Sequence, residues 1–177
     1  MMSGTWFIRA DQAERSLCLL ANSAARRRFV RGFFRGVSRL GDGVLWYCLM
    51  VVLPLWQGEA GLALTLRMAV GGGLGLLAYK QLKRRLVRER PFIGLIGIEC
   101  AMPPLDRYSF PSGHTLHAVL VTTLVLAALP VLTPWLVSFA MLVAASRVIL
   151  GLHYPTDVLA GAALGYGIAQ GVLLAAS

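Results

Sequence analysis

Charged residues are scarce in this sequence. Only 14% of its 177 residues are charged and 57% are hydrophobic, whereas a soluble domain usually has about a quarter charged residues and fewer than half apolar ones. Such a composition excludes an ordinary soluble domain. It predicts an integral membrane protein.

Cysteine is also rare. Cys18, Cys48 and Cys100 are odd in number and far apart, and the sequence has no CxxC motif or Cys/His cluster. We therefore expect neither a disulfide framework nor a metal site, and no cofactor. The first 40 residues lack an apolar core followed by a small-residue cleavage site, so we expect no cleavable signal peptide.

Acidic residues are few. The chain has 8 acidic and 17 basic residues and a net charge of +9, which favours anionic partners such as lipid headgroups or phosphates. The basic residues are interleaved with apolar segments and do not form a separable basic domain, which argues against nucleic acid as a partner.

Long apolar runs dominate the second part of the chain. A membrane span needs about 20 mostly apolar residues, fewer where its end is buried in protein. Residues 114–129, 135–152 and 158–176 fit this requirement, and "PLWQGEAG" divides an earlier run into 44–56 and 62–79. The sequence predicts an all-α, polytopic membrane bundle of about five helices, forming one domain over residues 43–177.

Residues 1–42 precede these spans. Within "RRRFVRGFFRGVSRL" the Phe, Val and Leu residues fall on one arc of a helical wheel, and the Arg residues except Arg26 fall on the other. This pattern is typical of an amphipathic helix that lies in the membrane surface with its basic side toward anionic headgroups. We expect such an interfacial helix in region 1–42.

Glycine-rich stretches lie inside two spans. "GGGLG" at 71–75 could be mistaken for a phosphate-binding loop, and "GAALGYGIAQG" has pairs of glycines four residues apart. Within a membrane helix, small residues at this spacing more often allow helices to approach closely. We interpret both stretches as helix-packing surfaces.

Five spans would bring residues 1–42, 80–113 and 152–157 to the same side of the membrane. Three polar clusters lie in or beside these segments: "KRRLVRERP", "PSGH" and "SRVILGLHYPTD". Lys83, Arg90 and Arg147 supply cations that suit phosphate oxygens. Ser112 and Gly113 lie where a helix begins, and free backbone N–H groups there also favour an anion.

Two histidines and one aspartate complete the set. One histidine can attack phosphorus while the other protonates the leaving oxygen, and a carboxylate beside an imidazole stabilises its positive form. These residues, His114, His153 and Asp157, predict phosphoryl transfer through a phosphohistidine. The arginine and lysine side chains can supply the charge stabilisation that a metal would otherwise give.

The pattern K-x6-RP, PSGH and SR-x5-H-x3-D, which spans residues 83–157, resembles the three-part signature of the type 2 phosphatidic acid phosphatase family. The signature also occurs in soluble acid phosphatases and vanadium haloperoxidases. The resemblance implies that His153 is the nucleophile, Asp157 its partner and His114 the general acid. It also implies metal-independent hydrolysis in a helical bundle, with the phosphate held by Lys83, Arg90, Ser112, Gly113 and Arg147.

Several nearby residues match no signature position. We interpret Arg84, Arg85 and Arg88 as anchors at the membrane end of a helix. We expect His117 to be structural or to line the path by which a lipid reaches the site. Another group could touch the substrate headgroup: Asp106, Arg107 and Tyr108.

The substrate predicted from these features is a membrane lipid phosphate or diphosphate. Undecaprenyl diphosphate, phosphatidylglycerophosphate, phosphatidic acid and a prenyl-linked sugar phosphate all suit an apolar bundle without a large soluble domain. A phosphotransferase that passes the phosphoryl group to an alcohol would use the same residues. A soluble haloperoxidase is excluded by the apolar spans.

We expect a multi-pass protein of a bacterial-type inner membrane. Of the 17 basic residues only Arg67 is placed toward the side opposite the polar clusters. The positive-inside rule then favours a cytoplasmic active-site face, although bacterial members of the family customarily have theirs outside the cytoplasm. A site for anionic phosphates would itself collect cations.

Overall fold

The computed structural model describes residues 3–176, and their side chains from Gln12 onward. Every regular element in this part of the chain is helical, which confirms the predicted all-α class. The elements are α1 (Ser3–Ala24), α2 (Arg28–Arg39), a π-turn (Leu40–Val44), α3 (Leu45–Gln57), α4 (Glu59–Arg85), α5 (Pro91–Gly94), α6 (Gly113–Ala128), a short 3-10 turn (Pro130–Leu132), α7 (Thr133–Ile149) and α8 (Pro155–Ala175).

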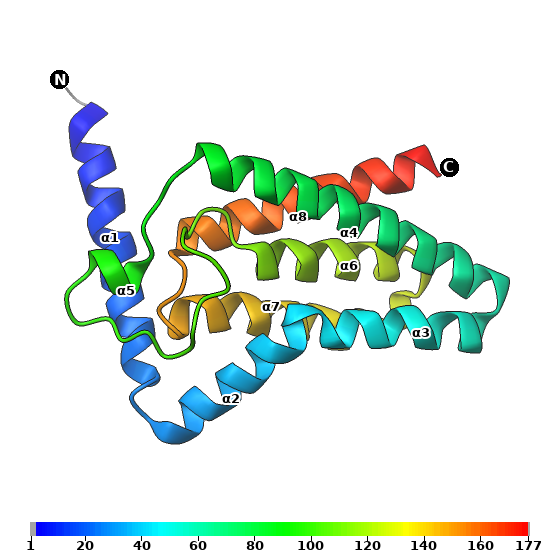
Figure 1. Cartoon of the computed structure of the whole chain (residues 1–177), viewed down its shortest axis with the longest axis horizontal. Coiled ribbons are helices and arrows are strands. Elements are labelled where there is room, and N and C mark those ends of the chain that lie inside the picture. The colour runs from blue at the N-terminus through cyan, green and yellow to red at the C-terminus, as the bar shows by residue number, and fades with distance from the viewer. Residues whose placement is uncertain (1–2, 177) are drawn as a thin grey trace.

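Helices α3, α4, α6, α7 and α8 run side by side and form the bundle, as Figure 1 shows. Four segments are long and apolar enough to cross a membrane: residues 28–57, 59–85, 130–149 and 155–175. Helix α6 is apolar but shorter. The five predicted spans therefore correspond to five helices, with boundaries that differ by a few residues.

The turn predicted within "PLWQGEAG" lies between α3 and α4. Gly58 has φ of +59°, a conformation that favours glycine. Three residues later, a Cβ atom on Gly61 would lie only 2.0 Å from the carbonyl oxygen of Leu53. The two helices can pack this closely at their turn only because Gly61 has no side chain.

Helix α6 occupies the centre of the bundle and packs against α4, α7 and α8. Its residues Leu116, Leu120 and Leu124 are fully buried. Lipid tails are as apolar as leucine, so contacts of this kind in a membrane are stabilised mainly by close packing. This burial also explains why a helix of only 16 residues can belong to the bundle.

Glycines permit the closest of these contacts. A Cβ atom on Gly161 would lie 2.5 Å from the carbonyl oxygen of Ser112, and one on Gly165 would lie 2.3 Å from that of Leu116. The packing interpretation is confirmed there, and also for Gly71 and Gly75, which face α6 side chains. A Cβ atom on any of the remaining glycines of the two stretches would meet nothing within 4 Å: Gly72, Gly73, Gly167 and Gly171.

Helix α1 lies across one end of the bundle, and α2 runs from α1 toward α3 (Figure 1). Asn22 ties α1 in place: its amide nitrogen donates to the carbonyl oxygens of Glu99 and Ile149, both at 3.0 Å. The Ile149 carbonyl belongs to the last turn of α7, where backbone acceptors lack partners within the helix. The sequence pattern did not predict a helix over residues 3–24.

The predicted amphipathic segment forms α2, which begins at Arg28 and ends at Arg39. Between α2 and α3 the chain leaves helical geometry at Asp42 and Gly43, where φ of Gly43 is +124°. The indole nitrogen of Trp46 donates to the carbonyl oxygen of Gly41 at 3.0 Å and holds this break. The break changes the direction of the chain and brings Asp42 to the surface of α6.

Candidate active site

The residues of the three polar clusters meet at the end of the bundle that α1 crosses (Figure 1). Lys83 lies in the last turn of α4, and Arg147 in the last turn of α7. His114 lies in the first turn of α6, and Asp157 in that of α8. Helix ends that are distant in the sequence therefore supply one polar site.

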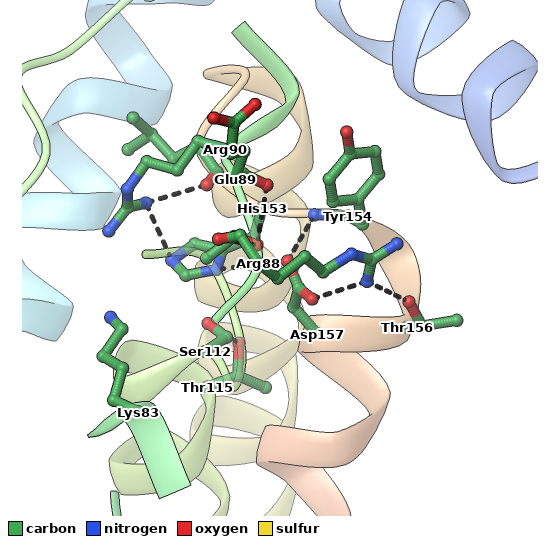
Figure 2. A network of polar contacts seen from close by, with 12 residues as sticks. Lys83, Arg88, Glu89, Arg90, Ser112, Thr115, His153, Tyr154, Thr156 and Asp157 are labelled. Atoms are coloured by element: carbon green, nitrogen blue, oxygen red, sulfur yellow. Dashed lines mark hydrogen bonds and ion pairs between the residues drawn. The ribbon is translucent and has the colours of Figure 1, made fainter. Parts of the chain in front are cut away.

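His153 lies among these helix ends and is 2% exposed. Its Nδ1 atom lies 3.6 Å from Oδ2 of Asp157, and its Nε2 atom lies 3.3 Å from Nη1 of Arg90 (Figure 2). Burial, opposed in part by Asp157 and assisted by the charges of Arg147 and Arg90, lowers the pKa of His153 to about 4. At neutral pH the imidazole is therefore uncharged.

Asp157 is held from several sides. Its Oδ2 atom accepts a hydrogen bond of 2.9 Å from the backbone N–H of Tyr154, so that the carboxylate also caps the first turn of α8. The main-chain oxygen of Asp157 accepts from the N–H of Ser112 at 3.0 Å. The start of α8 and the start of α6 are thereby fixed to each other.

Two of the predicted phosphate-binding cations meet at Asp106. Arg90 donates from Nη2 to Oδ1 of Asp106 at 2.7 Å, and Nζ of Lys83 lies 2.5 Å from the same oxygen. The hydroxyl of Tyr79 also donates to this carboxylate. Burial alone would raise the pKa of Asp106, but the bonds from Lys83 and Tyr79 hold it below its ordinary value.

The third cation, Arg147, is 2% exposed. Its Nη1 atom donates to the hydroxyl of Ser38, a buried residue of α2. Its Nε atom has no hydrogen-bond partner among the described residues. Because a guanidinium offers five donors, Arg147 keeps donors available while α2 holds it in place.

The second cluster forms the start of α6. Ser112 is the N-cap residue, is fully buried, and its hydroxyl lies 3.0 Å from that of Thr115. A Cβ atom on Gly113 would lie 2.8 Å from the ring of Tyr79, so glycine allows α4 to approach here. Nε2 of His114 lies 3.3 Å from Oδ1 of Asp42.

A groove of about 500 Å³ leads away from His114 between α3, α4 and α6. Asp42, Tyr79 and Gly113 lie at its polar end, and Trp46, Met50 and Met68 line its apolar part. His117, which was expected to be structural or to line such a path, lines it, and its ring nitrogen Nδ1 lies 2.9 Å from the carbonyl oxygen of Gly113.

The interpretation of Arg88 as a membrane-end anchor is wrong. Its guanidinium points into the site and donates to Oδ1 of Asp157 at 2.7 Å, as Figure 2 shows. Arg84 and Arg85 are exposed, as expected. The chain leaves helical geometry after Arg85, and this change of direction, which the run of basic residues does not reveal, turns Arg88 inward.

Other residues of the site were missed altogether: Glu14, Ser38, Asp42 and Tyr79. Each lies outside the three clusters in the sequence. The contact between Glu14 and Arg88 joins residues 74 positions apart. The fold of α1, α2 and the turn after α2 brings Glu14, Ser38 and Asp42 into the site. Tyr79 lies on α4 one turn before Lys83, so its place on the same helix face could have been inferred from the sequence.

A family model described as the PAP2 superfamily matches residues 43–176. The decaprenylphosphoryl-5-phosphoribose phosphatase of Mycolicibacterium smegmatis is 38% identical over 96 residues, which are 53% of this chain and 51% of that protein. This chain therefore spans about half the length of that relative.

Two solved structures have similar folds. LpxE of Aquifex aeolicus has a TM-score of 0.77 and 27% identity, covering 90% of this chain and 93% of that one. The first transmembrane PAP2 type phosphatidylglycerolphosphate phosphatase from Bacillus subtilis has a TM-score of 0.74 and 25% identity, covering 95% and 86%.

Proposed function

The chain belongs to the PAP2 superfamily, and from this premise we propose that it hydrolyses the phosphate ester or diphosphate of a membrane lipid. The observation that carries the proposal is the orientation of His153. Its Nδ1 atom faces Asp157 and its Nε2 atom faces the cation Arg90. A neutral imidazole held in this way offers the lone pair of Nε2 to a phosphorus atom beside Arg90.

In the first step, Nε2 of His153 forms a bond to phosphorus while the bond from phosphorus to the leaving oxygen breaks. His114 gives its proton to that oxygen. The phosphorylated ring keeps its Nδ1 proton and carries positive charge, which the nearby carboxylate of Asp157 offsets. The negative charge on the phosphoryl oxygens is stabilised by Lys83, Arg90, Arg147 and the backbone N–H groups at the start of α6.

In the second step, water attacks the phosphohistidine. Its oxygen forms a bond to phosphorus, the bond to Nε2 breaks, and the electron pair returns to the imidazole. His114, now neutral, takes the proton from water and regains the form in which it began. Inorganic phosphate leaves, so that atoms, protons and charge balance over one turnover.

The groove beside His114 supports a lipid as the substrate. It begins at the polar site, is lined mainly by apolar side chains, and lies between helices that cross the membrane. A hydrocarbon chain placed there would leave its phosphate next to His114. Arg90, Arg147 and His153 are deeply buried, which suits a headgroup no larger than a phosphate and a small substituent.

A prenyl-linked sugar phosphate is the second candidate substrate. The relative from Mycolicibacterium smegmatis, named for a decaprenylphosphoryl-5-phosphoribose, favours it. The Bacillus subtilis structure, named for phosphatidylglycerolphosphate, favours a glycerophospholipid. Both kinds of lipid place a phosphate at the bilayer surface and a long apolar chain below it.

Phosphate release by the purified protein tests the proposal. The panel consists of phosphatidic acid, phosphatidylglycerophosphate, undecaprenyl diphosphate and a polyprenyl sugar phosphate, all in the same detergent. His153→Ala should abolish release, and His114→Ala should slow it most for substrates with poor leaving groups. Normal turnover by the His153 variant, or no release from any lipid by the native protein, would overturn the proposal.

Vanadate and a chelator add two further measurements. Vanadate should inhibit because it forms a five-coordinate species that resembles the transition state of phosphoryl transfer. A chelator should leave turnover unchanged, because Lys83, Arg90 and Arg147 supply positive charge at the phosphate. Loss of turnover on chelation, with recovery on adding a divalent metal, would contradict this account of charge stabilisation.

A further inference from the structure

Arg88 joins the first helix of the chain to the carboxylate beside His153. Its Nη1 atom donates to Oδ1 of Asp157 at 2.7 Å, and its Nη2 atom donates to Oε2 of Glu14 at 2.6 Å. The guanidinium carbon lies 3.9 Å from the centre of the Tyr154 ring. Arg88 is therefore held on both sides by carboxylates and on one face by an aromatic ring.

Glu14 also contacts α8 directly. Its second oxygen, Oε1, accepts from the backbone N–H of Thr156 at 2.8 Å and from the hydroxyl of Thr156 at 2.5 Å. The Thr156 N–H is one of the donors in the first turn of α8 that lack a partner within the helix. A side chain of α1 thus caps the helix that carries Asp157, and Glu14 is itself buried.

The charges of the cluster explain why Arg88 matters to Asp157. Asp157 is fully buried, and an unpaired buried carboxylate is strongly disfavoured. One of its oxygens faces His153 and the N–H of Tyr154, while Arg88 neutralises the other. The carboxylates of Asp157 and Glu14 raise the pKa of Arg88 despite its burial, so the guanidinium stays charged.

We propose that Arg88 and Glu14 are positioning residues for the reaction, and that α1 thereby contributes to the active site. The inference rests on the proposed function, because it assigns to Asp157 the role of partner to the nucleophile. Arg88 holds the carboxylate charged and oriented toward His153. Glu14 fixes both Arg88 and the first turn of α8.

The alternative is that these contacts only attach α1 to the bundle. In that case their loss would lower stability and leave the chemistry of the surviving folded protein unchanged. The pH dependence of turnover separates the two. Around His153 the charged groups are Arg90, Arg147 and Asp157. Around Asp157 the charged group is Arg88, with Glu14 of α1 nearby. The thiol of Cys18, also in α1, is neutral because burial raises its pKa to about 12.

The experiment compares Arg88→Ala, Arg88→Lys and Glu14→Gln with Arg84→Ala and Arg85→Ala. The two controls remove the same charge from exposed positions of the same basic run. For each purified variant, kcat, KM and the pH profile of kcat are measured with the best lipid phosphate found for the native protein. The melting temperature is recorded in the same detergent.

We expect Arg88→Ala to lower kcat about 10- to 100-fold, as loss of a partner that orients a reacting group commonly does, with little change in KM. Removing the cation leaves Asp157 with less positive charge beside it, which should favour the protonated ring of His153, so the acidic limb of the profile should move to higher pH. Arg88→Lys should recover part of the loss. Glu14→Gln retains an acceptor for Thr156 and should have an intermediate effect.

Arg88→Ala and Glu14→Gln profiles that match those of Arg84→Ala in kcat and in acidic limb would overturn the inference, whatever their melting temperatures. If Arg88→Ala does not fold, Arg88→Lys and Glu14→Gln give the same comparison. His153→Ala separates this failure from failure of the proposed function. An inactive His153 variant beside unaffected Arg88 and Glu14 variants rejects only the role of α1.

Discussion

The carboxylate oxygen Oδ1 of Asp106 lies 2.5 Å from Nζ of Lys83 and 2.7 Å from Nη2 of Arg90. Two of the three cations proposed to hold the substrate phosphate are therefore already paired with an anion of the chain. Asp106 lies in the loop between α5 and α6, and its side chain is 31% exposed. A phosphate that binds the same cations must displace this carboxylate or share them with it.

We expect Asp106→Asn to tighten the binding of phosphate and vanadate. The amide keeps the shape and an acceptor oxygen but removes the competing charge, whose effect at this range is on the order of tenfold in affinity. Inhibition constants for both anions, measured at constant ionic strength, check this. Glu89→Gln is a matched control, because Glu89 is an exposed carboxylate close to Arg90 in the sequence. Weaker anion binding in Asp106→Asn would mean that Asp106 instead holds the cations in position.

The five helices of the bundle could be predicted because each carries a long apolar run. Residues 44–56 were expected as a span and α3 covers Leu45–Gln57, while residues 158–176 were expected and α8 covers Pro155–Ala175. Pro155 begins α8 earlier because proline suits the first turn of a helix. Helix α1 was missed, since "SGTWFIRADQAERSLCLLANSA" mixes charged and apolar residues without a long apolar run.

The candidate site likewise contains residues that the sequence could predict and residues that only the fold reveals. Six residues could be selected together because they stand at the spacings of the three-part signature: Lys83, Arg90, His114, Arg147, His153 and Asp157. Arg88 lies inside one of these stretches, but its contact with Asp157 depends on the path of the chain after α4. Ser38 and Asp42 reach the site only because the break at residues 40–44 turns α2 over the bundle end.

We expect the acidic limb of the kcat/KM profile to lie well below pH 6.5. The pKa of His153 is lowered from 6.5 to about 4, with burial as the main cause, so its nucleophilic form persists into mildly acid solution. Because the unfolded chain binds the proton more readily, this group also makes stability rise with pH between about 4 and 6.5, and the contribution is lost as pH falls through that window. Melting curves and initial rates across pH 4–8 measure both effects, and an acidic limb at pH 6.5 would contradict the assignment.

The groove predicts selectivity for long lipid chains. Gly72 and Gly73 line it, and a Cβ atom on either would meet nothing within 4 Å. We expect Gly73→Leu to fill the groove and to reduce kcat/KM for a long-chain lipid phosphate on the order of tenfold or more, since the lost hydrocarbon contacts are worth about 0.8 kcal/mol per CH₂ group. A soluble short-chain phosphate should be hydrolysed at the native rate.

Gly167→Leu is the matched control for this groove variant, because Gly167 is also an exposed helical glycine without neighbours within 4 Å and does not line the groove. Equal losses for the long and short substrates in Gly73→Leu would show damage to the pocket itself. Equal losses for the long substrate in both glycine variants would remove the groove from the explanation of chain selectivity.

The orientation in the membrane can be tested at the C-terminus. Helix α8 ends at the side of the bundle opposite α1 and the candidate site (Figure 1), so the C-terminus reports the face away from the site. Basic residues concentrate at the site end, in α2 and in the last turn of α4. From the positive-inside rule we expect the site on the cytoplasmic face and the C-terminus outside. A reporter that is active only in the cytoplasm should be silent when fused there.

Replacement of arginines by glutamine separates the two causes of this charge bias. Arg26 and Arg27 precede α2, and Arg28 is its first residue. In the described part of the chain, no hydrogen bond or ion pair joins their side chains to the proposed phosphate-binding residues. If they help to fix orientation, their replacement should increase the cytoplasmic signal of the C-terminal reporter. If cations gather at this end only because the pocket binds phosphate, the signal should not change. A strong signal from the unaltered chain would reverse the orientation, because the pocket and the C-terminus lie at opposite ends of the bundle.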